Sequence, residues 1–248
     1  MQEQFYHTLA TAQATHWWYS ARRTLLKHIL TTELECGIPD GPLYDLGCGV
    51  GCNLETLAKF RPTIGIDPST EAVTLCRKLC GENNNISILQ SSAEAVLSIG
   101  TPDPGIVVLT DVLEHVKEDG ECIKNISMRL PPDGLLIITV PAFEFLWGPS
   151  DVTSHHFRRY RKPQLKALVE PYFSVKLLTY FNTFLFPPIL VGRVFERIFN
   201  RPGDEGAGVP PPWLNRTLQT IMEAEIPLIK CGVLPFGVSL LAVLRKRA

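Results

Sequence analysis

The chain has 248 residues, of which 45% are hydrophobic and 20% are charged, and its formal net charge is −1. This size and composition suit one α/β domain with a decorated core. The near-neutral charge argues against broad binding to nucleic acid, which needs a basic surface.

Neither end of the chain reads as a membrane segment. The N-terminus, "MQEQFYHTLATAQ", lacks the basic start and apolar stretch of a secretory signal. The longest apolar tract begins at Ile226 and is interrupted by Lys230 and by prolines, so we do not expect it to span a bilayer. We therefore expect a cytoplasmic protein.

The seven cysteines, an odd number in mostly apolar surroundings, predict reduced thiols. Two pairs are four residues apart, Cys48 with Cys52 and Cys76 with Cys80. A zinc site could be drawn from them, but zinc sites more often use CxxC spacing with histidine partners. We therefore predict no metal.

Residues 3–142 alternate between helical and strand patterns. Helices are predicted over 3–34, 53–60, 68–80 and 119–130, and strands over 42–46, 63–67, 86–90, 105–111 and 135–140. Nearly continuous apolar strands that alternate with helices indicate a parallel sheet covered on both faces. Ligands of such sheets bind at the carboxyl ends of the strands. The polar residues at those ends are Asp45, Asp67, Ser91, Ser92 and Asp111.

The pattern changes after residue 142. A loop rich in aromatic and cationic residues leads to a helix that Pro163 can start, followed by a strand over 173–181. An apolar helix over 185–201 carries Arg193, Arg197 and Arg201. A turn-rich segment, an amphipathic helix over 213–230 and a closing strand over 236–246 complete the chain.

The stretch "LYDLGCGVGCNLETLAKF", from Leu43, passes from a strand through three alternate glycines into a helix. A dinucleotide-binding turn needs G-x-G-x-x-G, and Cys52 stands at the third glycine position. The acid at Asp45 suits a cationic ligand better than a pyrophosphate, which prefers bare amides. Asp67, at the end of the next strand, can accept hydrogen bonds from two ribose hydroxyls. The ligand implied has a ribose, a positive centre and no phosphate, which argues against a nicotinamide oxidoreductase.

Five segments over residues 42–142 together resemble the class I S-adenosylmethionine-dependent methyltransferases: "DLGCGVG", "GIDPS", "SSAEA", "LTDVLEHV" and "RLPPDGLLIITVPA". The resemblance implies an α/β fold with a Rossmann-like, seven-stranded, mostly parallel sheet, helices on both faces and an antiparallel last strand. It also implies S-adenosyl-L-methionine as methyl donor and S-adenosyl-L-homocysteine as product. We predict a single domain over 1–248, with a helical lid (1–41), a cofactor-binding core (42–142), a substrate-side loop and helix (143–172) and an apolar helical insert (181–233).

The resemblance also implies which residues hold the cofactor. The set is Asp45, Gly47, Gly49, Gly51, Asp67, Pro68, Ser91, Ser92, Ala93 and Asp111. The first glycines would lie against the methionine part and Asp67 against the ribose, with residues 91–93 around the adenine. Many relatives have an aspartate where this chain has Ser92. The alternatives are a plain tight turn for the glycines and a helix cap for Asp67.

The loop after the fifth strand resembles a narrower subset of these enzymes, which carries a tryptophan, an aspartate and an H-x-R-R-Y run. Here these are Trp147, Asp151 and residues 156–160, and "HWWYSARR" (16–23) matches the aromatic, basic N-terminal helix of that subset. We expect the substrate to meet Trp18, Arg22, Trp147, His156, Arg159 and Tyr160. Alternatively, Arg22 and Arg159 pair with Asp151 and glutamates to close the lid, and the tryptophans are packing.

A base is needed only if the acceptor atom carries a proton. The predicted catalytic residues are His156, His115 and Asp111. A structural role is the alternative for His115, and a structural contact is the main interpretation of Glu114.

We therefore predict a methyltransferase acting on a small, hydrophobic or lipid-linked acceptor, with oxygen, nitrogen and carbon all open as the methylated atom. The apolar helices over 181–230 leave open a peripheral membrane contact or a homodimer. No nucleic-acid partner is expected. The alternative is a catalytically silent methyltransferase-like fold that serves protein association.

Overall fold

The computed structural model describes residues 10–95, 100–199 and 208–248, without the side chains of 197–199. The strands are β1 (Leu43–Leu46), β2 (Thr63–Asp67), β3 (Ile86–Gln90), β4 (Ile106–Thr110), β5 (Leu135–Pro141), β6 (Phe173–Phe181) and β7 (Ser239–Lys246). The α-helices are α2 (Trp17–Glu35), α3 (Leu54–Leu57), α4 (Thr70–Cys80), α5 (Asp119–Arg129), α6 (Pro149–Thr153), α7 (Lys162–Val169), α8 (Phe186–Phe199), α9 (Pro212–Glu223) and α10 (Ile226–Lys230). Short 3₁₀ turns occupy Leu113–His115 (η2) and Glu144–Leu146 (η3).

The seven strands form one sheet in the order β3-β2-β1-β4-β5-β7-β6. All neighbours are parallel except those of β7, which is antiparallel to both β5 and β6. The predicted fold class is therefore confirmed. The chain builds outward from β1 to β3 and then returns to place β4 on the other side of β1. This reversal is a topological switch point, where ligands of open α/β sheets bind.

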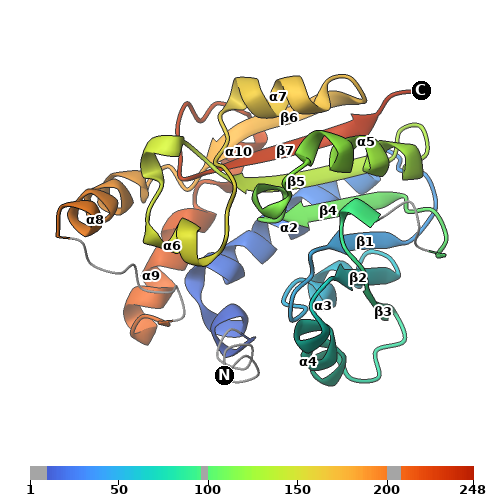
Figure 1. The fold of residues 1–248 in the computed structure, drawn as a ribbon, viewed down its shortest axis with the longest axis horizontal. Coiled ribbons are helices and arrows are strands. Elements are labelled where there is room, and N and C mark those ends of the chain that lie inside the picture. The colour runs from blue at the N-terminus through green and yellow to red at the C-terminus, as the bar shows by residue number, and fades with distance from the viewer. Residues whose placement is uncertain (1–9, 96–99, 200–207) are drawn as a thin grey trace.

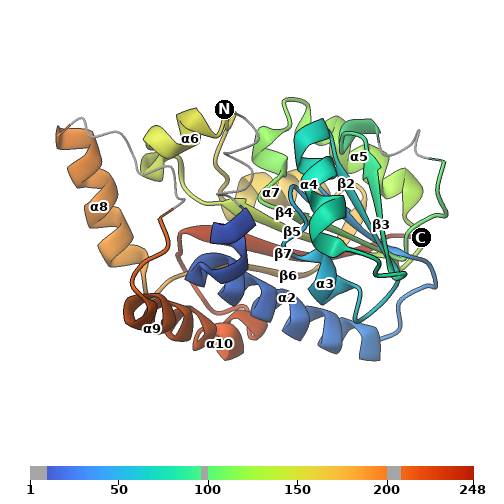
Figure 2. The same ribbon diagram turned by 90° about the horizontal axis from the view of Figure 1, so that it is seen from below.

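Helices cover both faces of the sheet. Helices α5 and α7 lie on one face, and α2, α3 and α10 lie on the other (Figures 1 and 2). Strands β4 and β5 are buried along their length, apart from partly buried Pro141, because they run between these layers. Their apolar residues join those of β7 and α2 in one core.

The N-terminal helix predicted over 3–34 is broken. Residues 3–9 lie outside the described part, residues 10–15 are helical, and α2 begins only at Trp17. His16 is extended and caps α2, because its side chain accepts a hydrogen bond from the Trp18 amide. Asn215 of α9 accepts a second one from the Trp17 amide. The break thus lets α2 dock against α9, which Figure 2 shows beside it.

The single helix predicted over 213–230 is also wrong, since α9 ends at Glu223 and α10 begins at Ile226. Pro227 lies in the first turn of α10. A proline is tolerated in the first turn of a helix but disrupts a helix interior, because it lacks the amide N–H and its ring clashes with the carbonyl four residues earlier. Glu225 is fully buried at the break and accepts hydrogen bonds from the Thr183 and Phe184 amides. The break therefore ties the helices to the end of β6.

The predicted membrane-facing arginines can be followed only in part. Arg193 pairs with Glu196 on α8, while the side chain of Arg197 and all of Arg201 lie outside the described residues. Val191 and Val194 are exposed on the same helix. Within the described residues, every helix is too short or too polar to cross a bilayer.

Candidate functional site

The glycine turn after β1 has a backbone that only glycine adopts readily. Gly47 and Gly49 have φ values of +71° and +55°. A Cβ on Gly47 would lie 2.5 Å from a methyl carbon of Val112. The Gly49 amide donates to Oδ2 of Asp67 at 2.8 Å. The turn from β1 is thereby fixed against the carboxyl ends of β2 and β4.

Asp45, just before this turn, is a buried carboxylate without a partner. Its exposed fraction is 0%, and among the described residues no donor reaches either oxygen in hydrogen-bonding geometry. Burial raises the pKa of Asp45 to about 7, an effect that the Arg22 charge and the nearby Asn53 side chain oppose and the Asp67 charge increases. An anion in this setting is stabilised by a cation that lies against it. A positively charged group bound beside Asp45 would therefore stabilise the charged form of this carboxylate.

Asp67 is oriented by backbone amides on both of its oxygens. Oδ1 accepts from Ser69 at 2.9 Å, and Oδ2 accepts from Gly49. Burial raises the pKa of Asp67, and these two amides oppose the rise. Each carboxylate oxygen can accept two hydrogen bonds, so each keeps capacity for a hydroxyl donor. Ser69, not Asp67, caps α4, because its Oγ accepts from the Ala72 amide.

The residues predicted around the adenine lie at the carboxyl end of β3, beside Asp67. The Ser91 amide donates to the backbone oxygen of Asp67 at 3.1 Å. Ser92 Oγ accepts from the Ala95 amide, and Ala93 is buried. Pro68 is exposed next to them. Gly51 faces away from this group, because a Cβ on it would lie 2.5 Å from the Cys76 sulfur.

Most of the cysteines are packed in the protein, whereas Cys36 and Cys231 are exposed. All seven are free thiols. Cys48, Cys76 and Cys80 form a small apolar cluster with Leu54 under the glycine turn. Among the described residues, the one group of side chains suited to hold a metal contains no cysteine.

Asp111 and Arg22 link the N-terminal helix to the end of β4. Asp111 has a φ of +55° and its Oδ2 accepts a hydrogen bond from the Arg22 guanidinium. Oδ1 accepts from Thr139 at 3.1 Å. Arg22 is 4% exposed and its charge also faces Asp45. The alternative that Arg22 pairs with Asp151 or a glutamate is wrong, since its partner is Asp111.

The H-x-R-R-Y loop is organised around Asp151, which is 0% exposed. Arg159 donates to both of its oxygens, at 2.8 and 2.9 Å, and the Gly148 amide donates to Oδ2 at 2.8 Å. Nδ1 of His156 lies 2.8 Å from Oδ1. Burial would raise the pKa of Asp151, but His156 and Arg159 lower it to about 2. The alternative pairing of Arg159 with Asp151 is thus confirmed.

Tyr160 and Trp18 lie in the framework. Tyr160 is buried, and its hydroxyl donates to Asp119 at 2.8 Å, which raises its pKa further above its usual range than burial alone. Trp18 stacks on Phe181 with ring centroids 5.9 Å apart. Trp147 is half-buried after η3. Arg159 and Tyr160 are therefore placed to shape the loop, with their polar atoms already engaged.

Glu114 and His115 follow β4 in η2, where they meet His156. The rings of His115 and His156 form an edge-to-face pair with centroids 4.6 Å apart. His115 is exposed at its outer edge, and desolvation of the ring by its packed neighbours, together with the nearby His156, lowers its pKa to about 4. Glu114 is 1% exposed and neither of its oxygens has a donor. Burial and the Asp111 charge raise the pKa of Glu114 well above its ordinary value.

Aromatic side chains gather beyond this cluster, where β5 and β6 end and β7 begins. Phe143 stacks on Tyr180 and on Phe145, with centroids 4.8 and 5.1 Å apart. Phe186 meets Phe143 and Phe236 edge-on. Phe145 and Phe236 remain 46% and 41% exposed. This surface, which we call the aromatic edge, offers partly exposed apolar side chains at the carboxyl ends of β5 and β6.

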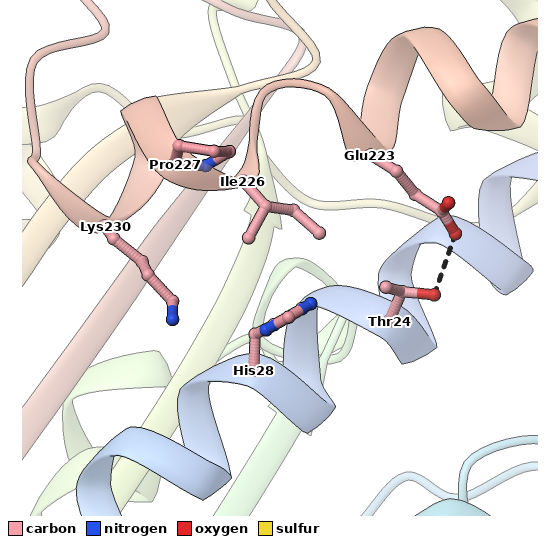
Figure 3. Close-up of a pocket in the computed structure, with 6 residues that line it drawn as sticks. All are labelled: Thr24, His28, Glu223, Ile226, Pro227 and Lys230. Atoms are coloured by element: carbon pink, nitrogen blue, oxygen red, sulfur yellow. Dashed lines mark hydrogen bonds between the residues drawn. The ribbon is translucent and has the colours of Figure 1, made fainter.

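A separate hollow of about 410 Å³ lies between α2 and the α9–α10 break (Figure 3). It is lined by Thr24, His28, Glu223, Ile226, Pro227 and Lys230. Thr24 donates to Glu223 across one end at 2.8 Å. None of the predicted site residues lines it.

Two residues of the site were not predicted from the sequence. Asn53 is buried behind the glycine turn and donates to Thr110 at 3.0 Å. Thr139 of β5 supports Asp111. The one feature that could have identified them is a polar residue close to the end of a predicted strand.

Comparison with known proteins agrees with this geometry. Residues 44–138 match a family model described as a methyltransferase domain. The chain is 30% identical over 98 residues to a ubiquinone biosynthesis O-methyltransferase of Caulobacter sp. strain K31, covering 39% of each chain. It is 28% identical over 127 residues to an indolepyruvate C-methyltransferase of Streptomyces griseus, covering 47% of this chain and 39% of the relative. The chain thus spans about two-fifths of the length of these curated relatives.

The fold likeness extends over most of the chain. A solved structure of a SAM-dependent methyltransferase from Archaeoglobus fulgidus superposes with a TM-score of 0.54 at 17% identity, covering 91% of this chain and 94% of that one. At this identity the likeness concerns the fold.

Proposed function

We propose, on the premise that the matched part of this chain belongs to the class I S-adenosylmethionine-dependent methyltransferase family, that the protein transfers a methyl group from S-adenosyl-L-methionine to a small, apolar acceptor. The observation that carries the proposal is Asp45. It is a fully buried carboxylate without donors, at the switch point of the sheet and beside a glycine-only turn. A ligand with a positive charge and no phosphate satisfies it.

The other predicted cofactor residues suit the same ligand. Asp67, held by two amides, keeps acceptor capacity for two ribose hydroxyls. Ser91 to Ala93 lie next to it at the end of β3, on the side expected for the adenine. Gly49, where a Cβ would meet nothing within 4 Å, leaves its backbone open to close approach by the methionine part, while Gly47 packs against Val112. When bound, S-adenosyl-L-methionine supplies an activated methyl group on a positively charged sulfur.

The chain's own part in the reaction is mostly positional. A methyl transfer needs the acceptor atom held in line with the donor and water kept away. The pair of Arg22 and Asp111 joins α2 to the end of β4, so it positions α2 beside the proposed site. The aromatic edge supports an apolar acceptor, because Phe145 and Phe236 are partly exposed there. The printed names of the relatives include oxygen and carbon methylation, so the acceptor atom is left to experiment.

His156 is the residue we expect to deal with an acceptor proton. Asp151 lies at Nδ1 of His156, which favours the tautomer with the proton on Nδ1 and leaves Nε2 as the basic nitrogen. Arg159 in turn positions Asp151. An acceptor hydroxyl would lose its proton as the methyl group arrives. We expect His156 to take part in removing this proton, either by accepting it directly or through a group bound between the two.

The test is release of S-adenosyl-L-homocysteine from S-adenosyl-L-methionine, measured with a panel of small phenols, amines and enolisable carbon acceptors. We expect turnover with one class of apolar acceptor. His156→Ala should lower the rate on a hydroxyl acceptor by roughly 10²–10⁴, the range for loss of a proton-transfer group. The exposed neighbour His155 supplies the control, His155→Asn, which should keep full turnover.

A silent fold that serves protein association is the second candidate. It is favoured by exposed apolar side chains outside the site, notably Val191 on α8 and Trp213 on α9, which are 68% and 71% exposed. Tight cofactor binding with no product from any acceptor class would favour it over an enzyme.

A further inference from the structure

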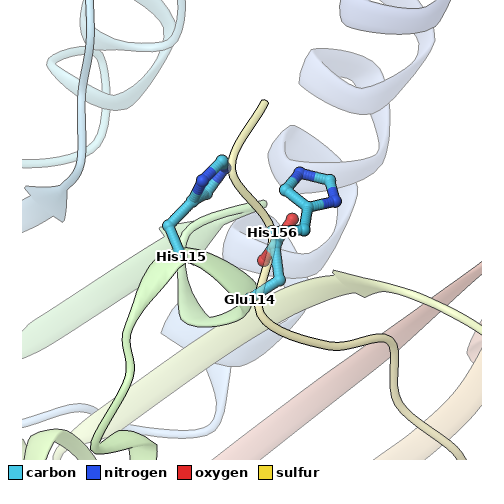
Figure 4. A group of neighbouring side chains, drawn as sticks. All are labelled: Glu114, His115 and His156. Atoms are coloured by element: carbon cyan, nitrogen blue, oxygen red, sulfur yellow. The ribbon is translucent and has the colours of Figure 1, made fainter. Parts of the chain in front are cut away.

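Glu114, His115 and His156 bring one carboxylate and two imidazoles together at the carboxyl end of β4 (Figure 4). Each offers one potential ligand atom, and these atoms all lie within 4.8 Å of one another. Two of the residues come from η2, and the third comes from the loop after α6. The group is thus assembled by the fold and is separate from the cofactor residues around Asp45.

Glu114 is the least satisfied member of the group. It is 1% exposed, and both carboxylate oxygens lack a donor. The amide of Phe157 donates to the backbone oxygen of Glu114 instead of its side chain. The nearby arginines are engaged elsewhere, Arg22 by Asp111 and Arg159 by Asp151. Both arginines act on Glu114 only through space, and neither donates a hydrogen bond to it, so a cation bound directly against the carboxylate would stabilise its charged form.

His156 is already arranged as a ligand. Asp151 lies at its Nδ1, so Nε2 is the nitrogen left to bind. Metal-bound histidines almost always donate their other ring N–H to a carboxylate or a backbone carbonyl, which fixes the ring. Here Arg159 and the Gly148 amide hold that carboxylate in turn. The backbone of Ser154 contacts His115 in a comparable way.

We propose that Glu114, His115 and His156 bind one first-row divalent transition-metal ion, with a coordination position open toward the acceptor. Two histidines and one carboxylate are a known ligand set for Zn²⁺ and for non-haem Fe²⁺, and such sites keep a position for water or substrate. Glu114 supplies the negative charge and the imidazoles supply neutral nitrogens. The ion in turn neutralises the buried carboxylate.

The role of the ion in the reaction rests on the proposed function. The open position would take an oxygen of the acceptor, and a divalent ion lowers the pKa of a hydroxyl bound to it. The hydroxyl proton passes to water, and the oxygen keeps its electron pair. That pair forms the bond to the methyl carbon, while the pair of the breaking sulfur–carbon bond stays on sulfur. In this arrangement His156 acts through the ion, and the acceptor class is narrowed to hydroxyl compounds.

Metal binding is tested on the full chain without cofactor or acceptor. Chelator-treated protein is titrated with Co²⁺ and followed by its visible absorption, and Zn²⁺ is then added in competition. We expect one equivalent of Co²⁺ with nitrogen and oxygen ligands, displaced by Zn²⁺. His115→Ala and His156→Ala should weaken binding by at least 10–100-fold, the loss typical even for outer-shell partners. Glu114→Gln should do the same.

His155→Asn is the matched control. His155 is an exposed neighbour with a φ of +55°, a conformation that asparagine tolerates, and it lies outside the ligand group. If Glu114→Gln fails to fold, the exposed His115 still carries the test. The proposal is overturned if native protein binds no Co²⁺, if the variants bind as the native chain does, or if thiolate-to-cobalt absorption shows that cysteines hold the ion. Intact Co²⁺ binding without any affinity for S-adenosyl-L-methionine would instead contradict the proposed function alone.

Discussion

Two buried aspartates, Asp45 at the proposed cofactor site and Asp151 on the proposed acceptor side, are equally hidden from solvent but differ in the hydrogen bonds that they receive. Asp151 receives Arg159, His156 and the Gly148 amide, and its pKa is about 2. Asp45 receives no donor, and burial raises its pKa to about 7. One carboxylate is completed by the chain, and the other is left for a ligand.

The difference between Asp151 and Asp45 distinguishes a residue that supports the fold from one that is available to a ligand. The acceptor-side loop is held by a charge network that is closed within the chain, so its arginine and tyrosine act on shape. The cofactor side has an open acceptor, Asp45, beside an oriented one, Asp67. Substitutions on the first side should therefore be seen in stability, and those on the second in ligand affinity.

The largest effect on folding is expected for Asp151→Asn. It leaves the Arg159 guanidinium buried without its counter-charge, which should lower the free energy of unfolding by about 3–5 kcal/mol. Urea unfolding measures it. Glu170→Gln, which breaks the exposed pair with Lys166, should change the same quantity by less than about 0.5 kcal/mol. Similar small losses in both variants would show that Asp151 is not a structural centre.

Gly47→Val should lower both the stability of the fold and the affinity for the cofactor. The positive φ and the 2.5 Å approach to Val112 should together cost about 2–4 kcal/mol of stability and close the cofactor turn. Gly81→Val shares the strain, with a φ of +57°, but meets nothing within 4 Å. We expect it to lose less stability and to retain cofactor affinity. Unfolding and S-adenosyl-L-homocysteine titration of both variants decide the matter.

Asp67→Ala should act on affinity more than on stability, although it also removes the side-chain acceptor of the Gly49 and Ser69 amides. It removes the acceptor of two ribose hydroxyls, each bond to a carboxylate contributing about 1.5–3 kcal/mol, so the Kd should rise by roughly 10² or more. Glu71→Ala removes the same charge from an exposed site in the first turn of α4. If Glu71→Ala weakens binding as much, the effect is general electrostatics and Asp67 has no ribose contact.

The smallest effect is a pH dependence that Asp45 imposes. Its pKa is raised in the folded chain, so between its ordinary value and about 7 the folded state holds a proton that the unfolded state has released. Stability contributed by this group therefore falls as pH rises through that window. A cationic ligand favours the charged form, so affinity should rise with pH up to about 7 with release of a proton. Calorimetry in two buffers measures the proton, and Asp45→Asn should abolish the dependence.

The strand ends that line the proposed cofactor site could be predicted from the sequence because their residues lie in short contiguous segments. Asp45, Gly47 and Gly49 stand in one turn, and Asp67 follows the next strand. The alternation of apolar strands and helices predicted the order of elements, and the family resemblance implied the antiparallel β7. Register places those strand ends side by side once the sheet is parallel.

The acceptor side could be predicted only in outline. His156 meets Glu114 because a loop after α6 returns to η2, and no local pattern records that contact. The partner of Arg22 was missed because it depends on where α2 crosses the sheet. The break at Glu225 was missed for a similar reason, since it answers to amides at the end of β6. Tertiary contacts decided each of these points.

The most direct test of the central claim is calorimetric titration of the full chain with S-adenosyl-L-methionine, alongside NAD⁺ and the Asp45→Asn variant. We expect one site for S-adenosyl-L-methionine, proton release on binding below about pH 7 in the native chain alone, and no binding of NAD⁺. Absence of S-adenosyl-L-methionine binding, or binding that is indifferent to Asp45, would contradict it.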